Sequence, residues 1–305
     1  MKAPGRKPLG VRIPRPPPIP RAEWLALAAL VALVALLFRD AIFRGRVFYD
    51  RDIHLLWYGL AQTFVRSVAA GSWPVWNPYP ALGQPLLALP NSEVAYPFTW
   101  LNLVVQPGAY FTAFASFHIL VAAVGTYVFA RQLPLSPVAA CGAAALWCAS
   151  GPLLCLVNGW NHLPGSALIP WMFLAGDRAG RRGRLEDGFV WGAVLGLALL
   201  AGSPEAAAMG GLGSAVHALR HVARRNAGAR DRTRLVGMAA LAVVFAAGLA
   251  AVQWWPTLEV ARRSARGQLD PAARGFWSVH PAGPRGRRRG TSRGSARTRA
   301  GGSIR

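Results

Sequence analysis

Long apolar stretches separated by arginine-rich segments constrain the fold of this chain more than any other feature. Four of them approach or exceed the roughly 17 to 25 residues that a helix needs to cross a bilayer core of about 30 Å. They contain almost no charged residues at mid-length, which argues against a proton-coupled pump. These four stretches are residues 22–38, 109–130, 135–157 and 235–252.

For three shorter apolar stretches, a re-entrant hairpin competes with a full crossing, and we count all three as crossings. They are residues 163–175, 188–201 and 206–219. Because a backbone in lipid must satisfy its own hydrogen bonds, each crossing is expected to be helical. The sequence therefore predicts an all-α integral membrane protein with about seven transmembrane helices.

The arginines predict the orientation of these crossings. Residues 1–21 form a basic, proline-rich arm that we expect to be extended and cytoplasmic. The arginine-rich segments 178–184 and 220–234 then also fall in the cytoplasm, as the positive-inside rule favours. A large first outer loop, residues 39–95, falls on the opposite face together with residues 262–266, although both contain arginines.

The outer loop contains an expected amphipathic helix from Asp52 to near Gly71, because apolar residues recur at steps of three and four. An aromatic, proline-stiffened turn follows at residues 73–79. Aromatic side chains are enriched at membrane interfaces, so we expect the helix to lie along the membrane surface. Its expected apolar face consists of Ile53, Leu56, Trp57, Leu60, Phe64 and Val68.

Acidic residues and one histidine of the outer face are the candidate functional side chains. Asp50 or Asp52 either caps the amphipathic helix or acts as a general base on a substrate hydroxyl, and the two roles are compatible. Glu205, in the run Ser203-Pro-Glu205, is either part of a helix start or a second functional carboxylate. His162 is either a donor to a phosphate or a solvated loop residue.

The outer-loop motif carries a family resemblance. Asp52 heads the helix, and Gly71-Ser-Trp-Pro-Val-Trp-Asn-Pro-Tyr79 is followed by Gly83-Gln-Pro85 and Tyr96-Pro97. This pattern resembles YfhO-type bacterial membrane proteins, which belong among the GT-C-like multi-pass glycosyltransferases. The resemblance covers roughly residues 22–281, and its most specific positions are Trp76, Asn77, Pro78, Tyr79, Gly83 and Gln84.

The resemblance implies transfer of a sugar from a polyprenyl-phosphate donor to a cell-envelope polymer, at the outer face of the bacterial cytoplasmic membrane. The catalytic carboxylate of such enzymes matches Asp52 best, Asp50 second and Glu205 less well. The sequence has no cofactor motif, and no metal ligands are assigned, although a divalent metal remains compatible with this chemistry. The arginines that can neutralise the departing phosphate are Arg51, Arg262 and Arg263.

A non-catalytic carrier or assembly factor that binds lipid or polymer is the alternative function. A catalyst is expected to lose activity in the substitution Asp52→Asn while remaining folded, whereas a carrier is expected to keep its binding. The expected partners are therefore the lipid bilayer, the lipid-linked sugar and the polymer acceptor.

The tail, residues 282–305, is rich in Arg and Gly and contains no acidic residue. Such a run does not fold by itself. One interpretation is a basic tail that binds anionic lipid; nucleic acid is disfavoured because the topology places the tail outside. We favour a shifted reading frame near residue 283, which makes the chain an N-terminal fragment of a longer enzyme.

Overall fold

The computed structural model describes residues 20–49, 52–224 and 228–264. The basic arm up to residue 19, Asp50, Arg51 and the tail after residue 282 therefore lie outside the described residues. The chain divides into two compact units, Met1–Glu259 and Val260–Arg305. The first unit contains all the helices named below except the end of the last one, which belongs to the second unit.

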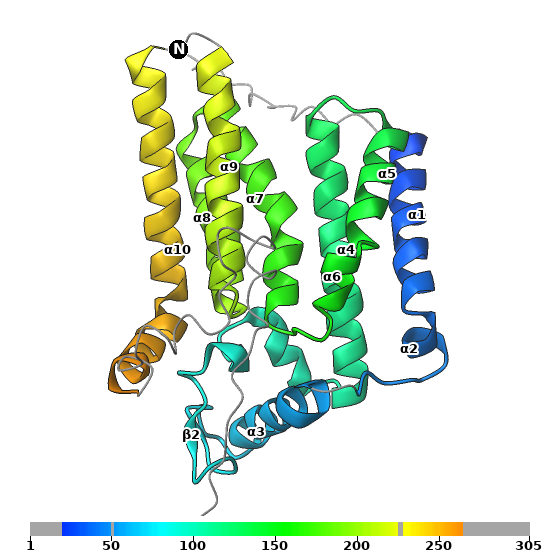
Figure 1. The fold of residues 1–305 in the computed structure, drawn as a ribbon, viewed down its shortest axis with the longest axis vertical. Helices are drawn as coiled ribbons and strands as arrows, with labels where there is room; N and C mark the ends of the chain where they lie inside the picture. Colours follow the sequence, from blue (N-terminus) through cyan, green and yellow to red (C-terminus); the bar gives the residue numbers. More distant parts are fainter. Residues whose placement is uncertain (1–19, 50–51, 225–227, 265–305) are drawn as a thin grey trace, which may run out of the picture. The chain divides into compact units, whose positions relative to one another are not determined.

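Helices form most of the described structure, so the prediction of an all-α protein is confirmed. Every predicted apolar stretch lies in one or two of them, and the long helices run alongside one another (Figure 1). They are α1 (Arg21–Leu37), α4 (Pro107–Gln132), α5 (Pro137–Cys148), α6 (Gly151–Cys155), α7 (His162–Arg182), α8 (Leu185–Leu200), α9 (Pro204–Arg224) and α10 (Ala229–Arg263).

The prediction of about seven transmembrane helices is wrong. Among the described residues, only α4 and α10 are long and apolar enough to cross a membrane. The most apolar part of α4 is 50% buried inside the protein, and that of α10 is 28% buried. Two such helices are weak evidence for a membrane protein, because a buried core helix meets the same criterion.

Local chemistry explains why the other five stretches do not qualify. The stretch 135–157 is divided in two, because α5 ends at Cys148 and Ser150 starts a new helix, α6, by accepting a hydrogen bond from the amide of Leu153 as its N-cap. With 16 residues, α8 is about 24 Å long, which is short of a bilayer core. The last turn of α7 carries Arg181 and Arg182, the last turns of α9 carry Arg220 and His221, and α1, with 17 residues, is at the lower limit of the length that spans a bilayer.

The predicted amphipathic helix is present as a π-helical turn, η1 (Ile53–Trp57), that continues into α3 (Tyr58–Ala69). Its position differs from the prediction. Ile53, Trp57 and Phe64 are buried within the protein, and the ring of Phe64 packs edge-on against Trp100 at 5.2 Å between centroids. The apolar face of this helix therefore packs against the rest of the fold instead of lying on a membrane surface.

Short elements connect α1, α3 and α4. They lie at the same end of the long helices as α3 (Figure 1). The two strands pair antiparallel, with Trp76 opposite Pro85 and Asn77 opposite Gln84. The polypeptide then turns twice through 3-10 helices before α4 begins. These elements are α2 (Arg39–Phe43), β1 (Trp76–Asn77), β2 (Gln84–Pro85), η2 (Pro90–Ser92) and η3 (Pro97–Leu103).

Candidate functional site

A groove of about 460 Å³ separates α3 from the β1–β2 ribbon. It brings together three positions of the predicted loop motif, Asn77, Tyr79 and Gln84, with the polar face of the amphipathic helix. The motif is therefore one wall of a groove rather than an isolated turn. The polar and aromatic side chains that line it are Gln62, Thr63, Arg66, Asn77, Tyr79 and Gln84.

Asn77 fixes the ribbon to α3. Its side-chain oxygen accepts a hydrogen bond from the amide of Tyr79 at 3.2 Å and lies 3.4 Å from the hydroxyl of Thr63, whose single hydrogen it shares with the carbonyl of Gly59 at 2.9 Å. Asn77 is 4% exposed, so these bonds satisfy a buried amide group whose loss would be costly. The asparagine of the motif thus sets the width of the groove and the direction of Tyr79.

Gly83 closes the ribbon and has a backbone φ of +109°. A Cβ atom at this position would lie 2.4 Å from the indole ring of Trp76. Only glycine tolerates both the backbone conformation and the contact. Two further positions of the motif, Trp76 and Gly83, are therefore structural partners that shape the ribbon.

Among the described residues that line the groove, Arg66 is the only charged one. Its guanidinium lies over the ring of Tyr79, 5.5 Å from the centroid, which is a favourable cation–π arrangement. Arg66 was not among the residues predicted from the sequence, because the prediction for this helix used its apolar face. The available signal was its place on the opposite face, four residues after Gln62.

Asp52, the first choice for the catalytic carboxylate, immediately precedes η1 and is exposed. It makes no side-chain capping hydrogen bond, so the predicted capping role is not seen. It precedes Leu55 and Leu56, which line the groove, by three and four residues. Asp52 therefore lies on the same helix face, about one turn beyond the lined part of the groove.

Glu93 is a second acidic group near the groove, and sequence reasoning missed it. It is 2% exposed, has a left-handed backbone φ of +52°, and burial raises the pKa of its carboxyl group well above the usual range. Among the described residues, neither Glu93 Oε1 nor the indole nitrogen of Trp57 has a hydrogen-bond partner. The signal in the sequence was that Glu93 is the only acidic residue between Asp52 and Asp177.

Glu93 and Trp57 line a second cavity of about 20 Å³, together with Thr99 and Asn102. A cavity of this size accommodates one water-sized group with several polar partners. Leu60 lines both this cavity and the groove, so the two are neighbours across one side chain. A neutral Glu93 carboxyl group can donate or accept a hydrogen bond there.

His162 and Glu205, the other predicted polar candidates, lie together. Nδ1 of His162, at the start of α7, is 3.8 Å from a carboxylate oxygen of Glu205 in the first turn of α9. The adjacent loops are joined by a hydrogen bond of 3.0 Å from the side-chain amide of Asn161 to the carbonyl of Gly202. The structure thus pairs these two candidates but does not place them in the groove lining.

Arg262 and Arg263, two of the three predicted phosphate-binding arginines, are exposed in the last turn of α10. They belong to the second compact unit. The third, Arg51, lies outside the described residues together with Asp50. Among the described residues, the arginine in the groove is Arg66.

The groove combines the groups that bind a sugar phosphate. Amide side chains exchange hydrogen bonds with hydroxyl groups, an aromatic ring offers a flat apolar face, and a guanidinium binds phosphate oxygens. The described residues of the lining include no carboxylate, so an anionic ligand meets no repulsion from them. This is the chemistry of a site for a phosphorylated, hydroxyl-rich molecule.

Comparison with known proteins adds no relative: no family model, curated protein or solved structure matches this chain.

Proposed function

We propose that this chain is a GT-C-like membrane glycosyltransferase, related to the YfhO-type proteins that its loop motif resembles. In this proposal the groove between α3 and the ribbon binds a polyprenyl-phosphate-linked sugar. The sugar then passes to a cell-envelope polymer at the outer face of the bacterial cytoplasmic membrane. The observation that carries the proposal is the presence of Arg66, Tyr79 and three amide side chains around one groove.

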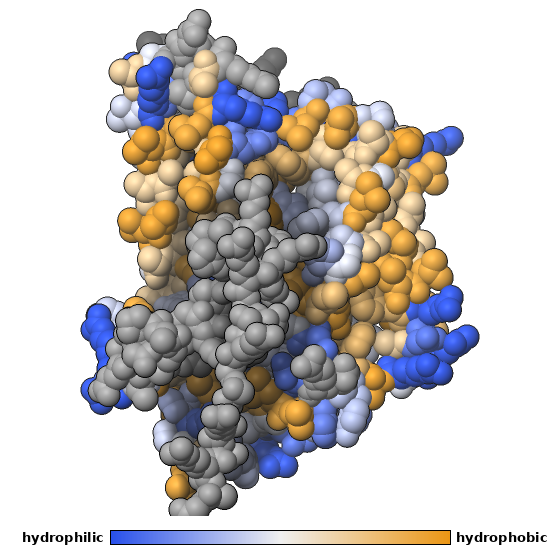
Figure 2. Space-filling model, viewed as in Figure 1, coloured by the Kyte–Doolittle hydropathy of each residue, from blue (hydrophilic) through white to orange (hydrophobic). Residues whose placement is uncertain are grey.

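Exposed apolar side chains support a membrane location. On the face shown in Figure 2, hydrophobic residues cover the middle of the helices and hydrophilic residues gather toward their ends. Exposed examples are Leu25 on α1, Leu212 on α9 and Val244 on α10. Contiguous apolar surface of this kind is typical of contact with lipid or another protein. In the proposal, α4 and α10 cross the bilayer, and a prenyl chain stays in the lipid beside them.

The proposed chemistry assigns one role to each charged group. The Asp52 carboxylate accepts the proton of the acceptor hydroxyl, whose oxygen attacks the anomeric carbon of the sugar. The bond from that carbon to the phosphate oxygen breaks, and the polyprenyl phosphate leaves with the electron pair. Arg66 stabilises the charge that develops on this phosphate.

Transfer of a radiolabelled sugar by the purified full-length chain in lipid vesicles tests this proposal. Asp52→Asn is expected to lower the transfer rate by about 10² to 10⁴-fold, as for the loss of a general base, with donor binding retained. Asp40→Asn is the matched control, because Asp40 is also an acidic residue near a short helix, paired with Arg44 on the surface. Equal transfer by wild type and Asp52→Asn would show that the proposed mechanism is wrong.

A non-catalytic carrier is the second candidate, and the position of Asp52 outside the groove lining favours it. For a carrier, Arg66→Gln weakens binding of the lipid-linked sugar, and Asp52→Asn has no effect on any measured property. The transferase proposal instead requires both substitutions to reduce transfer. Measuring donor binding and transfer on the same two variants separates these candidates.

A further inference from the structure

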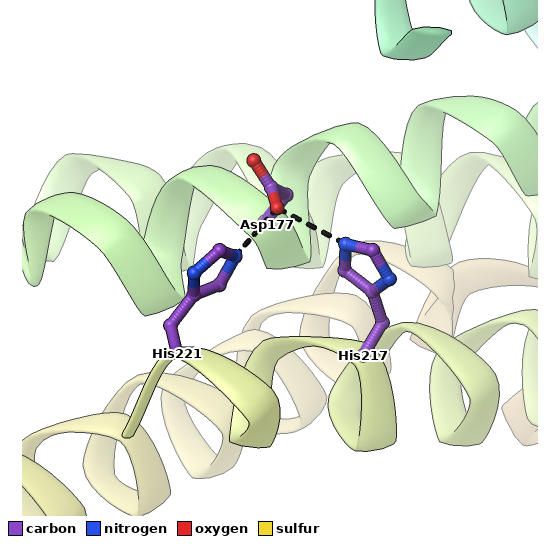
Figure 3. A group of neighbouring side chains, drawn as sticks. All are labelled: Asp177, His217 and His221. Carbon is purple, nitrogen blue, oxygen red and sulfur yellow. Dashed lines mark hydrogen bonds and ion pairs between the residues drawn. The ribbon is translucent and has the colours of Figure 1, made fainter. Parts of the chain in front are cut away.

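Asp177, His217 and His221 form a compact cluster between α7 and α9 (Figure 3). Asp177 lies fifteen residues after His162 on α7, so the cluster is about 22 Å along that helix from the His162–Glu205 pair. It therefore belongs to neither the groove nor the loops described above. The proposed sugar transfer uses none of the three side chains.

The geometry of the cluster is convergent. Nε2 of His221 lies 2.6 Å from Oδ1 of Asp177, and Nε2 of His217 lies 3.0 Å from the same oxygen. One ligand atom from each of the three residues lies within 4.8 Å of the others. The side chain of Asp177 is fully buried, while those of His217 and His221 are 12% and 14% exposed.

The sequence produces this arrangement in two steps. His217 and His221 are four residues apart, so they project from the same face of α9. Gly176 and Gly180 let α7 approach α9 closely: a Cβ atom at Gly176 would lie 2.9 Å from the carbonyl oxygen of Ser214. The backbone approach brings Asp177 between the two imidazoles.

We propose that Asp177, His217 and His221 bind a divalent transition-metal ion of the Zn²⁺ class. Two imidazole nitrogens and one carboxylate oxygen are a common set of three protein ligands for such ions. With metal–ligand distances of about 2.0–2.2 Å, tetrahedral geometry separates the ligand atoms by about 3.3 Å. The observed separations of 2.6 and 3.0 Å need to widen by about 0.7 and 0.3 Å to reach this value.

Arg181 orients the carboxylate for this role. Its Nε lies 2.7 Å from Oδ2 of Asp177, so this ion pair occupies the oxygen that the histidines do not contact. Oδ1 thus remains directed at the imidazoles, as expected for a group held by an outer-sphere partner. Arg220 approaches Oδ1 at 3.5 Å from a side chain that is 32% exposed, and it has room to turn away when an ion binds.

One ligand of the cluster, His221, borders a cavity. His221 and Arg181 line a cavity of about 220 Å³ that also contacts Arg182, Asp231 and Arg234. Three protein ligands leave the fourth position of a tetrahedral ion free. With arginines around it, that position suits an anionic oxygen ligand, whose charge balances the ion and its neighbours.

Metal binding to the full-length chain tests the site without any activity assay, so its outcome does not depend on sugar transfer. Chelator-treated protein in detergent is titrated with Co²⁺, and then Zn²⁺ is used to displace it. We expect one equivalent of Co²⁺ with tetrahedral ligand-field absorption. We also expect Arg181→Gln to weaken binding by about 10 to 100-fold, and His217→Gln or His221→Gln to weaken it at least as much. His162→Gln is the matched control and should bind as wild type does.

Wild-type protein without this absorption, or unchanged affinity in His217→Gln and His221→Gln, would overturn the proposal. Thermal unfolding of the metal-free variants shows whether each is folded. If the variants do not fold, X-ray absorption spectroscopy of the Zn²⁺-loaded wild type decides the question. Two imidazoles and one carboxylate at about 2.0–2.2 Å support the site, and a first shell without imidazole refutes it.

Discussion

Nδ1 of His162 lies 3.8 Å from a carboxylate oxygen of Glu205, although the two residues begin different helices, α7 and α9. Both side chains are substantially exposed, at 45% and 65%. Such a pair contributes little to stability because water screens it. The pair lies beside the loops that precede these two helices, and we expect it to contribute little to folding.

Substitution of Glu205 tests this interpretation. Glu205→Gln is expected to change the free energy of unfolding by less than about 1 kcal/mol, as for other exposed ion pairs. Chemical denaturation of wild type and variant measures the difference. A destabilisation of several kcal/mol would mean that the pair holds the two helices together. Asp40→Asn, which removes the partner of Arg44 in another exposed pair, serves as the control.

Glu93 gives a prediction about pH. Because burial raises its pKa in the folded state, the native carboxyl group stays protonated where the unfolded chain ionises. Wild-type stability is therefore expected to fall as pH rises above the ordinary value of 4.5, by up to about 1.4 kcal/mol per pH unit. In Glu93→Gln, this dependence should disappear.

Thermal unfolding in detergent across this range checks the Glu93 prediction. Wild type and Glu93→Gln should show their largest difference at neutral pH, with the variant the more stable of the two. Parallel stability profiles for both proteins at every pH would contradict the assignment of Glu93 as a buried neutral acid. Glu186→Gln is a suitable control, because Glu186 pairs with Arg184 on the surface.

The ribbon depends on glycine at position 83. Gly83→Ala adds a Cβ atom 2.4 Å from the ring of Trp76, whereas Gly71→Ala, also at positive φ, meets no atom within 4 Å. Both variants bear backbone strain, which is larger at Gly83 (φ +109°) than at Gly71 (φ +71°), and only Gly83→Ala adds a collision. We expect Gly83→Ala to be less stable by about 1–3 kcal/mol more than Gly71→Ala. Equal free energies of unfolding would show that Trp76 moves aside without cost.

Close packing of α8 on α10 gives a further prediction. A Cβ atom at Gly192 would lie 2.6 Å from the carbonyl oxygen of Ala242, whereas one at Gly248 of α10 meets nothing within 4 Å. Gly192→Ala is therefore expected to destabilise the protein by about 1–3 kcal/mol. Gly248→Ala should stabilise it by about 0.5–1 kcal/mol through helix propensity. Denaturation curves that rank the two variants in the opposite order would contradict this helix pairing.

The positions of the helices were predictable from the sequence. The number of helices that are long and apolar enough to cross a membrane was not. Apolar runs show where a helix forms, and each predicted run does lie in helical structure. They do not show that Ser150 caps a new helix within the run 135–157. They also do not show that α7 and α9 continue into charged last turns around Asp177 and His221, where burial offsets polarity.

The candidate site was predicted in part. Asn77, Tyr79 and Gln84 of the motif line one groove, and the ribbon pairs Asn77 with Gln84. Arg66 and Glu93 were missed, since their relation to the motif depends on how α3 and η2 pack. Long-range packing cannot be read from local periodicity.

The metal cluster shows the same division. His217 and His221 carry a recognisable signal, because histidines four residues apart share one helix face. Asp177 lies 40 residues earlier, and only the close approach of α7 and α9 places it between them. The sequence therefore offered two ligands of the proposed site, and the fold supplies the third.

Photochemical crosslinking tests most directly whether the groove between α3 and the ribbon binds the sugar donor. A polyprenyl-phosphate sugar with a photoreactive group on the sugar is bound to the full-length chain in vesicles, irradiated, and the labelled peptides are identified. We expect labelling in η1 and α3 around Leu55 to Arg66 and in the ribbon from Asn77 to Gln84. Unlabelled donor should reduce this labelling by competing for the groove. Labelling confined to other segments, or labelling that unlabelled donor does not compete away, would contradict the groove as the donor site.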